Sequence, residues 1–114
     1  MAFIDELFSL TDKKVVITGS GGFLCSKMAI GLHHAGCSIA LLDLENSRVE
    51  EVAREIRDEG GKALTINIDV SKKQDFERCL NKTLKEFGRI DVLINGAGIN
   101  APTPFLEISE EEWD

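Results

Sequence analysis

A glycine-rich stretch near the start of the chain has the composition of a phosphate-binding turn. It reads TGSGGFLC over residues 18–25 and lies between an apolar run and a helix-like stretch. Backbone N–H groups at a helix N-terminus bind phosphate oxygens, aided by the helix dipole. Gly19, Gly21 and Gly22 allow positive φ angles and close approach of the backbone to a ligand. The stretch predicts a pyrophosphate site, the alternative being a tight turn without a ligand.

The third glycine expected in such a turn is missing. By a GxxGxxG count it falls near Cys25. This glycine serves the packing of the helix against the strand. Because cysteine is small, we expect a slightly wider gap between helix and strand, with phosphate binding retained.

An acidic residue follows the next apolar run. Asp43 lies about 20 residues beyond Gly22, the separation at which a carboxylate binds the adenosine ribose of a dinucleotide. This carboxylate would accept hydrogen bonds from the 2′ and 3′ hydroxyls and would repel a 2′-phosphate. The sequence therefore predicts NAD as the cofactor and NADP as a poorer ligand. The alternative for Asp43 is a solvated residue at the end of a strand.

Apolar runs alternate with amphipathic stretches along the chain, which indicates strands alternating with helices. Buried strands are expected at residues 14–18, 38–43, 62–69 and 90–95. Helices are expected at residues 24–35, from Ser47 to Gly60 and from Ser71 to Gly88, the two serines each opening a capping box. The expected buried face of the third helix is Phe76, Cys79, Leu80, Thr83, Leu84 and Phe87. The predicted fold class is α/β, a doubly wound parallel sheet of about four strands and three helices.

Charge and composition argue against several classes of partner. The formal net charge is −7 and the pI is about 4.8, which opposes binding to nucleic acid or to an anionic membrane surface. The first ten residues lack the basic region of a signal peptide, and no apolar run approaches the roughly 18 residues of a membrane span. We therefore expect a cytoplasmic protein without nucleic-acid or membrane partners.

Cysteine and histidine usage predicts no metal centre. Cys25, Cys37 and Cys79 are odd in number and form no CxxC pair, so reduced, partly buried thiols are expected rather than a disulfide framework or a zinc site. His33 and His34 lie late in a predicted helix, with no third ligand at metal spacing.

The end of the chain carries the signals of a helix start. Ser109 and Glu112 form a capping box, and Trp113 and Asp114 follow at once. A single helical turn is not stable in isolation. We therefore expect residues 1–114 to be a piece of a longer protein, the alternative being a natural end with a frayed tail.

Motifs at the ends of the four predicted strands together resemble the short-chain dehydrogenase/reductase family. They are residues 18–25, Asp43, Asp69-Val70 and the run Asn95-Gly96-Ala97-Gly98. The opening LFSLTDKKVVITG is also similar to that family's start, so the resemblance covers essentially the whole chain. It implies a Rossmann-type NAD(P)-binding domain over residues 1–114, incomplete because the C-terminal half of the family's fold is absent.

The resemblance implies four groups of residues around a dinucleotide. Those surrounding the pyrophosphate and its ribose are Gly19, Ser20, Gly22, Phe23 and Leu24. Those facing the adenosine ribose are Asp43 and Leu44, and those flanking the adenine are Asp69 and Val70. Those that hold the central sheet together and lie beside the nicotinamide ribose are Asn95, Ala97 and Gly98. For Asn95 a purely structural role, tying the fourth strand to its neighbour, is the alternative.

Two departures from the family pattern stand out. The family usually has TGxxxGxG, and here Phe23 and Cys25 replace the later glycines. It usually has NNAG, and here Gly96 replaces the second asparagine. These variants resemble the subset of the family that acts on sugar acids, of the mannonate oxidoreductase or fructuronate reductase type.

The resemblance also implies a reaction, hydride transfer between a nicotinamide and an alcohol or ketone. In the family a tyrosine is the acid/base, a lysine lowers its pKa, and a serine and an asparagine orient the substrate. The Tyr-x-x-x-Lys motif comes after a further helix and strand, and this chain contains no tyrosine. We therefore predict no catalytic residue here, no turnover by this chain alone, and a small-molecule substrate only for the longer protein.

The fourth strand would have a further strand beside it in a doubly wound sheet. Without that neighbour, Val92, Leu93 and Ile94 would present an open apolar edge. We expect self-association or homo-oligomer formation through this edge.

Three interpretations follow. The first is an oxidoreductase represented by its cofactor half, the second a small dinucleotide-binding module without chemistry, and the third an assembly fragment with a degenerate pocket. The glycine spacing with Asp43 favours the first two over the third. The unfinished helix and the bare edge favour the first over the second.

Overall fold

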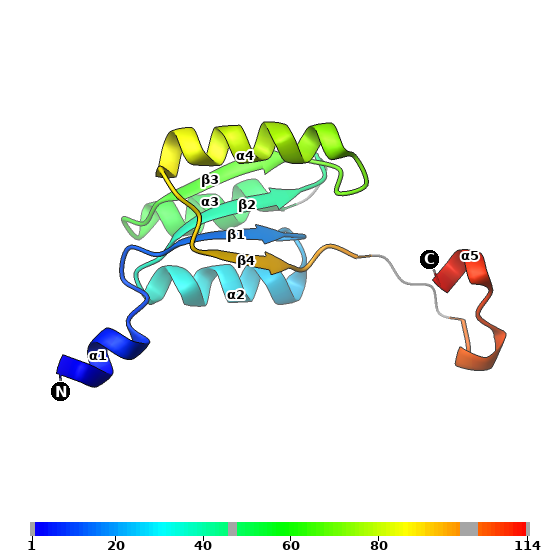
Figure 1. Ribbon diagram of the computed structural model, residues 1–114, viewed down its shortest axis with the longest axis horizontal. Helices are drawn as coiled ribbons and strands as arrows, with labels where there is room; N and C mark the ends of the chain where they lie inside the picture. Colours follow the sequence, from blue (N-terminus) through cyan, green and yellow to red (C-terminus); the bar gives the residue numbers. More distant parts are fainter. Residues whose placement is uncertain (1, 46–47, 99–102, 114) are drawn as a thin grey trace.

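The computed structural model describes residues 2–45, 48–98 and 103–113. One parallel sheet has the strand order β3-β2-β1-β4, with helices on both faces (Figure 1). Its elements are α1 Ala2–Phe8, β1 Lys14–Thr18, α2 Phe23–His34, β2 Ser38–Asp43, α3 Val49–Asp58, β3 Ala63–Asn67, α4 Lys73–Phe87, β4 Val92–Asn95, the 3₁₀ turn η1 Phe105–Glu107 and α5 Glu110–Trp113. The predicted doubly wound parallel α/β fold is confirmed.

The prediction differs from the structure at several element ends. β3 covers residues 63–67 rather than 62–69, and β4 begins at Val92 rather than at residue 90. The start of β4 is set by Asp91, whose carboxylate Oδ2 accepts a hydrogen bond of 2.8 Å from the Lys14 backbone N–H. This bond, together with the Arg89 guanidinium, lowers the pKa of the Asp91 carboxyl. The short helix α1 was not predicted.

The sheet register brings the strand ends to one edge. Thr18 at the end of β1 is level with Leu42 on β2 and with Asn95 on β4. Asp43, one residue further along β2, is level with Asn67 on β3. The segments that follow all four strands therefore meet at the carboxyl edge of the sheet.

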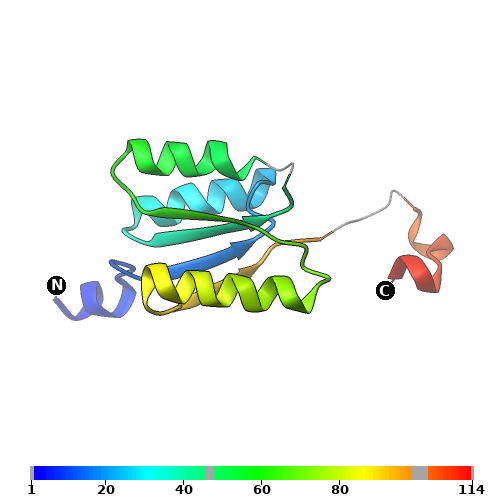
Figure 2. The same ribbon diagram turned by 90° about the horizontal axis from the view of Figure 1, so that it is seen from above.

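The core lies in two layers, one on each face of the sheet. Alternate residues of β1 point to opposite faces: Val15 and Ile17 pack under α2 and α3, while Val16 packs towards α4. Figure 2 shows α2 and α3 on one face and α4 on the other. Because both faces are covered, β1 and β2 are continuous apolar runs without polar alternation.

The predicted capping boxes can be compared with the observed N-termini of the helices. The Ser71 box is wrong: α4 begins at Lys73, and the Ser71 hydroxyl donates to Asp69 Oδ1 at 2.6 Å instead. The Ser109 half of its box is confirmed, since its Oγ accepts a 3.2 Å hydrogen bond from the Glu112 backbone N–H. The Glu112 carboxylate accepts a 3.1 Å hydrogen bond from the Thr103 hydroxyl instead. Ser47 lies outside the described residues.

The predicted buried face of α4 is too wide. Cys79 and Thr83 are buried against the sheet, but Phe76, Leu80 and Leu84 are exposed. These three side chains lie one turn apart along the flank of α4, and the described part of the chain leaves 39–48% of each residue exposed. Leu93 on the edge strand β4 is also 55% exposed.

No helix within the described ranges combines the length and the apolar character needed to cross a bilayer.

Candidate functional site

A hollow of about 500 Å³ opens at the carboxyl edge of the sheet. It is lined by Gly19, Gly22, Asp43, Leu44, Ile68, Asp69, Val70, Ser71, Gly96, Ala97 and Gly98. β1 lies between β2 and β4, so the chain leaves β1 on one side and later returns on the other. Ligands of open α/β sheets bind at this kind of switch point, outside the carboxyl ends of the strands.

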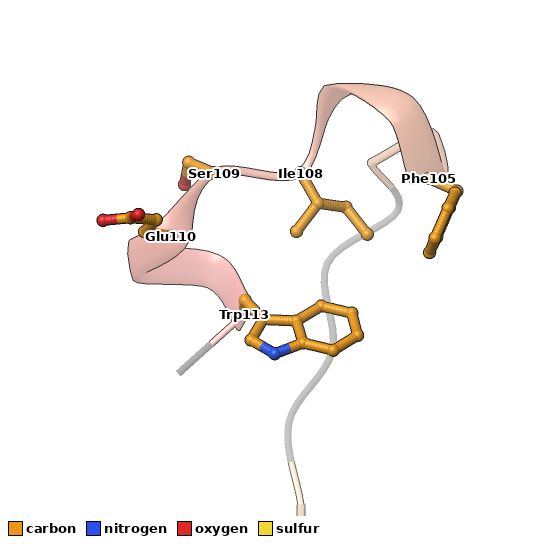
Figure 3. A pocket seen from close by; sticks show the side chains of 5 residues that line it. All are labelled: Phe105, Ile108, Ser109, Glu110 and Trp113. Atoms are coloured by element: carbon orange, nitrogen blue, oxygen red, sulfur yellow. The ribbon is translucent and has the colours of Figure 1, made fainter.

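A second hollow of about 530 Å³ is formed by the C-terminal segment alone. Figure 3 shows Phe105, Ile108 and Trp113 around it, with Ser109 and Glu110 at its rim. All five residues come from one short segment that lies beyond the sheet edge (Figure 1). The first hollow is the candidate site because separate strand ends supply its walls.

The glycine turn after β1 is shaped by close backbone contacts. Gly19 has φ +67°, and a Cβ at this position would lie 2.8 Å from the backbone of Gly96 and Ala97. Only glycine allows both this conformation and this approach. The Gly22 N–H donates to the Gly19 carbonyl at 3.1 Å, which closes the turn at the start of α2. The turn and the segment after β4 are thus packed against each other at the floor of the hollow.

The N-terminus of α2 is fitted for an anion. Its N-cap is Gly22, so no side chain caps the helix, and its first turn holds no acidic residue. The other α-helices of the described ranges all carry acidic residues in their first turns. Free N–H groups and an uncompensated helix dipole favour a phosphate at this position.

Asp43 fixes the turn as well as lining the hollow. Its Oδ2 accepts a hydrogen bond of 2.9 Å from the Gly21 N–H, and its Oδ1 accepts one of 2.8 Å from the Leu44 N–H. Each carboxylate oxygen keeps capacity for a second hydrogen bond. Ser20, fully buried, adds a further tie because its hydroxyl donates to the Leu42 carbonyl at 3.2 Å.

The segment after β3 forms another wall. Asp69 Oδ1 accepts hydrogen bonds from the Ser71 hydroxyl at 2.6 Å and from the Ser71 N–H at 3.0 Å. These bonds, the hydroxyl first, lower the pKa of the Asp69 carboxyl. Val70 and Leu44 present exposed apolar side chains to the same hollow. Such a surface can receive an aromatic base.

Thr18 holds the segment after β4 in place. Its buried hydroxyl oxygen accepts hydrogen bonds from the Gly96 N–H at 3.0 Å and the Ala97 N–H at 3.1 Å. Sequence reasoning gave Thr18 no site role. The available signal was its place directly before Gly19, but the role depends on a contact with residues 78 and 79 positions away.

Two residues that depart from the family motifs, Cys25 and Gly96, pack against each other, whereas the Phe23 side chain is exposed to solvent. A Cβ at Gly96 would lie 2.1 Å from Cys25 Sγ. The thiol therefore occupies the space that a side chain at position 96 would need. Cys25 itself is buried. Together with the Thr18 carbonyl oxygen, which would lie 2.8 Å from the same Cβ, the thiol favours glycine at position 96.

The residues predicted around the dinucleotide fall into two groups. The hollow is lined by Gly19, Gly22, Asp43, Leu44, Asp69, Val70, Ala97 and Gly98. The other four do not line it: Ser20 is buried, Phe23 and Leu24 are 79% and 69% exposed at the start of α2, and Asn95 ends β4. Ile68, Ser71 and Gly96 line it without having been predicted.

Comparison with known proteins identifies the family. The model of the short chain dehydrogenase family matches residues 13–114. The chain is 40% identical over 100 residues to a diacetyl reductase [(S)-acetoin forming] of Staphylococcus epidermidis, covering 88% of this chain and 39% of that protein. It is 34% identical over 111 residues to the 5-keto-D-gluconate 5-reductase of Escherichia coli, covering 97% of this chain and 44% of that protein.

A solved structure agrees with this. A Haemophilus influenzae protein with bound NAD, provisionally named a D-mannonate oxidoreductase, matches with a TM-score of 0.78 and 35% identity, over 96% of this chain and 41% of that one. The chain belongs to the short-chain dehydrogenase/reductase family, whose members are oxidoreductases that bind nicotinamide dinucleotides. It spans less than half the length of the relatives it matches.

Proposed function

We propose that this chain is the NAD-binding part of an oxidoreductase that transfers hydride between the nicotinamide and an alcohol or ketone. The observation that carries the proposal is the meeting of the uncapped N-terminus of α2 with the Asp43 carboxylate at one hollow. When bound, the dinucleotide supplies the hydride acceptor or donor. Calorimetric titration with NAD tests the proposal. One molecule bound per chain is expected, and no binding at millimolar NAD would contradict it.

The proposed placement follows the lining of the hollow. The N–H groups at the start of α2, with Gly19 and Gly22, bind the pyrophosphate. Asp43 binds the adenosine ribose, and Leu44, Asp69 and Val70 enclose the adenine. Ala97 and Gly98 border the nicotinamide ribose. Phe23 and Leu24 reach the dinucleotide through their backbone, since their side chains point to solvent.

Ser20 and Asn95 have different proposed roles. Ser20 acts through its bonds to Leu42, which hold the turn. Asn95 stands at the register position next to Thr18 and ties β4 to β1. Both position the turn and the segment after β4 without touching the dinucleotide.

We expect no substrate turnover by the 114-residue chain alone. The family's acid/base is a tyrosine, and the chain contains none. An absorbance assay of nicotinamide reduction over a panel of alcohols should show no substrate-dependent rate above that of denatured protein. A saturable rate would contradict this expectation.

For the substrate of the longer protein we propose a sugar acid. The support is the likeness to the 5-keto-D-gluconate 5-reductase and to the protein named a D-mannonate oxidoreductase. The likeness to a diacetyl reductase favours a small ketone as the second candidate. Both classes present a ketone for reduction, so kcat/KM of the longer protein on 5-keto-D-gluconate and on diacetyl decides between them.

The alternative function is a non-catalytic dinucleotide-binding or assembly module. The observation that favours it is exposed apolar surface: Leu93 on the edge strand, and Phe76, Leu80 and Leu84 on α4. We propose that the chain self-associates through the edge of β4. We also propose that the protein is located in the cytoplasm, where the three free thiols stay reduced.

Light scattering tests this assembly. We expect the weight-average mass to rise above 12.6 kDa with concentration. Replacing Leu93 by lysine should suppress the rise, because a charged side chain on an edge strand opposes its pairing with a strand of another molecule. A monomer at all concentrations would contradict the expectation. Lysine at the exposed Leu106, which lies away from the sheet, is the matched control.

A further inference from the structure

We propose that His33, His34 and Glu59 form a binding site for a divalent transition-metal ion of the Zn²⁺ type. The three side chains lie at the edge of the sheet opposite the dinucleotide hollow, where α2 and α3 both end. Their ligand atoms all lie within 4.8 Å of one another. The proposal is independent of dinucleotide binding, since none of the three lines that hollow.

The distances between the ligand atoms suit one ion. His33 Nε2 lies 3.4 Å and His34 Nε2 lies 2.8 Å from the same carboxylate oxygen, Glu59 Oε2. A tetrahedral zinc ion with bonds of about 2.0–2.1 Å places its ligand atoms roughly 3.3 Å apart. Small side-chain rotations would therefore seat an ion among these atoms. Imidazole and carboxylate are ligands that Zn²⁺ accepts, and a fourth position stays open to water.

The His33 ring is held in place before any ion binds. Its side chain is only 10% exposed, while those of His34 and Glu59 are 57% and 45% exposed. A Cβ at Gly61 would lie 2.3 Å from His33 Nδ1, so the ring fills space that only glycine leaves open. A fixed first ligand lowers the cost of ordering the site. The two exposed ligands leave the ion open to solvent.

The two helix ends favour a cation at this position. Ala35 is the C-cap of α2, and Glu59 is the C-cap of α3. The C-terminus of a helix carries partial negative charge, which attracts positive ions. Without an ion, the pair His34 and Glu59 is an exposed contact, and exposed contacts of this kind contribute little to stability.

Sequence spacing could not reveal the third ligand. Two adjacent histidines alone predicted no metal role, because Glu59 is 25 residues from His34. The fold supplies it, since β2 and α3 return the chain to the same edge.

Titration of the 114-residue chain with Zn²⁺ in a buffer without chelators tests the proposal. We expect one ion per chain by calorimetry, and binding weakened about tenfold or more in His34→Gln and in Glu59→Gln. Both side chains are about half exposed, so these variants should keep the wild-type circular dichroism. Asp58→Asn, which removes the neighbouring charge of α3, is the matched control and should bind as the wild type does.

Co²⁺ absorption provides a second readout. We expect visible d–d bands of a nitrogen and oxygen site, lost in Glu59→Gln. A thiolate charge-transfer band would place the ion on a cysteine and overturn the proposal. So would an absence of saturable Zn²⁺ binding up to about 1 mM, or unchanged affinity in both variants.

Discussion

Alanine at position 96 is expected to destabilise the wild-type chain strongly, and to destabilise it less once the thiol of Cys25 is gone. The new Cβ would stand 2.1 Å from Cys25 Sγ and 2.8 Å from the Thr18 carbonyl oxygen. Overpacking of this kind costs about 1–3 kcal/mol, and we expect Gly96→Ala to lie at the upper end. In a Cys25→Ala background the sulfur contact disappears, while the contact with the Thr18 carbonyl oxygen and the 3.6 Å contact with the Cβ of residue 25 remain.

Urea unfolding of the four chains measures this as a double-mutant cycle. We expect a coupling free energy of about 1 kcal/mol or more between positions 25 and 96. Gly98→Ala is the matched control, because a Cβ at Gly98 meets no atom within 4 Å. Additive effects of the two substitutions would show that Cys25 and Gly96 are unrelated departures from the family motif.

Removing the charge of Asp43 is expected to weaken NAD binding and to abolish discrimination against NADP. We propose that the carboxylate accepts hydrogen bonds from the ribose hydroxyls while it holds the Gly21 and Leu44 N–H groups. Hydrogen bonds to charged groups are worth about 1.5–3 kcal/mol, so Asp43→Asn should raise the Kd for NAD by roughly 10- to 100-fold. The amide nitrogen cannot accept a bond, so one backbone N–H would also lose its partner.

Parallel titrations with NAD and NADP separate the two effects. We expect the wild-type chain to prefer NAD, and the Asp43→Asn chain to bind both weakly. Glu45→Gln removes a nearby exposed carboxylate and should leave both affinities unchanged. A wild-type chain that binds NADP as tightly as NAD would contradict the assignment of Asp43 to the ribose.

The sheet was predictable because strands that are buried on both faces are continuous apolar runs in the sequence. β1 and β2 are continuous apolar runs ended by Thr18 and Asp43, and parallel pairing brings those ends together. This is why the sequence could place Gly19 and Asp43 at one edge of the sheet, while Asp69 was added by the family resemblance. Helix α1 was not predicted. None of its residues is buried, so its apolar residues do not follow the pattern of a helix face that packs on a core.

Details that depend on contacts distant in sequence were not predictable. Periodicity shows that Phe76, Leu80 and Leu84 share a flank of α4, but not whether another element covers that flank. The roles of Thr18 and Ser71 arise from hydrogen bonds whose partners are fixed only by the fold. The contact between Cys25 and Gly96 also depends on the fold. In the sequence these two residues are separate departures from the family motifs.

NMR of the ¹⁵N-labelled chain can show directly whether NAD binds at the carboxyl edge of the sheet. We expect the amides of residues 19–25, 43–44, 69–71 and 96–98 to shift together and to saturate with one affinity. Amides of residues 105–113, which form the other large hollow, should not move. Shifts confined to residues 105–113, or no shifts at millimolar NAD, would contradict the assignment of the dinucleotide to the carboxyl edge of the sheet.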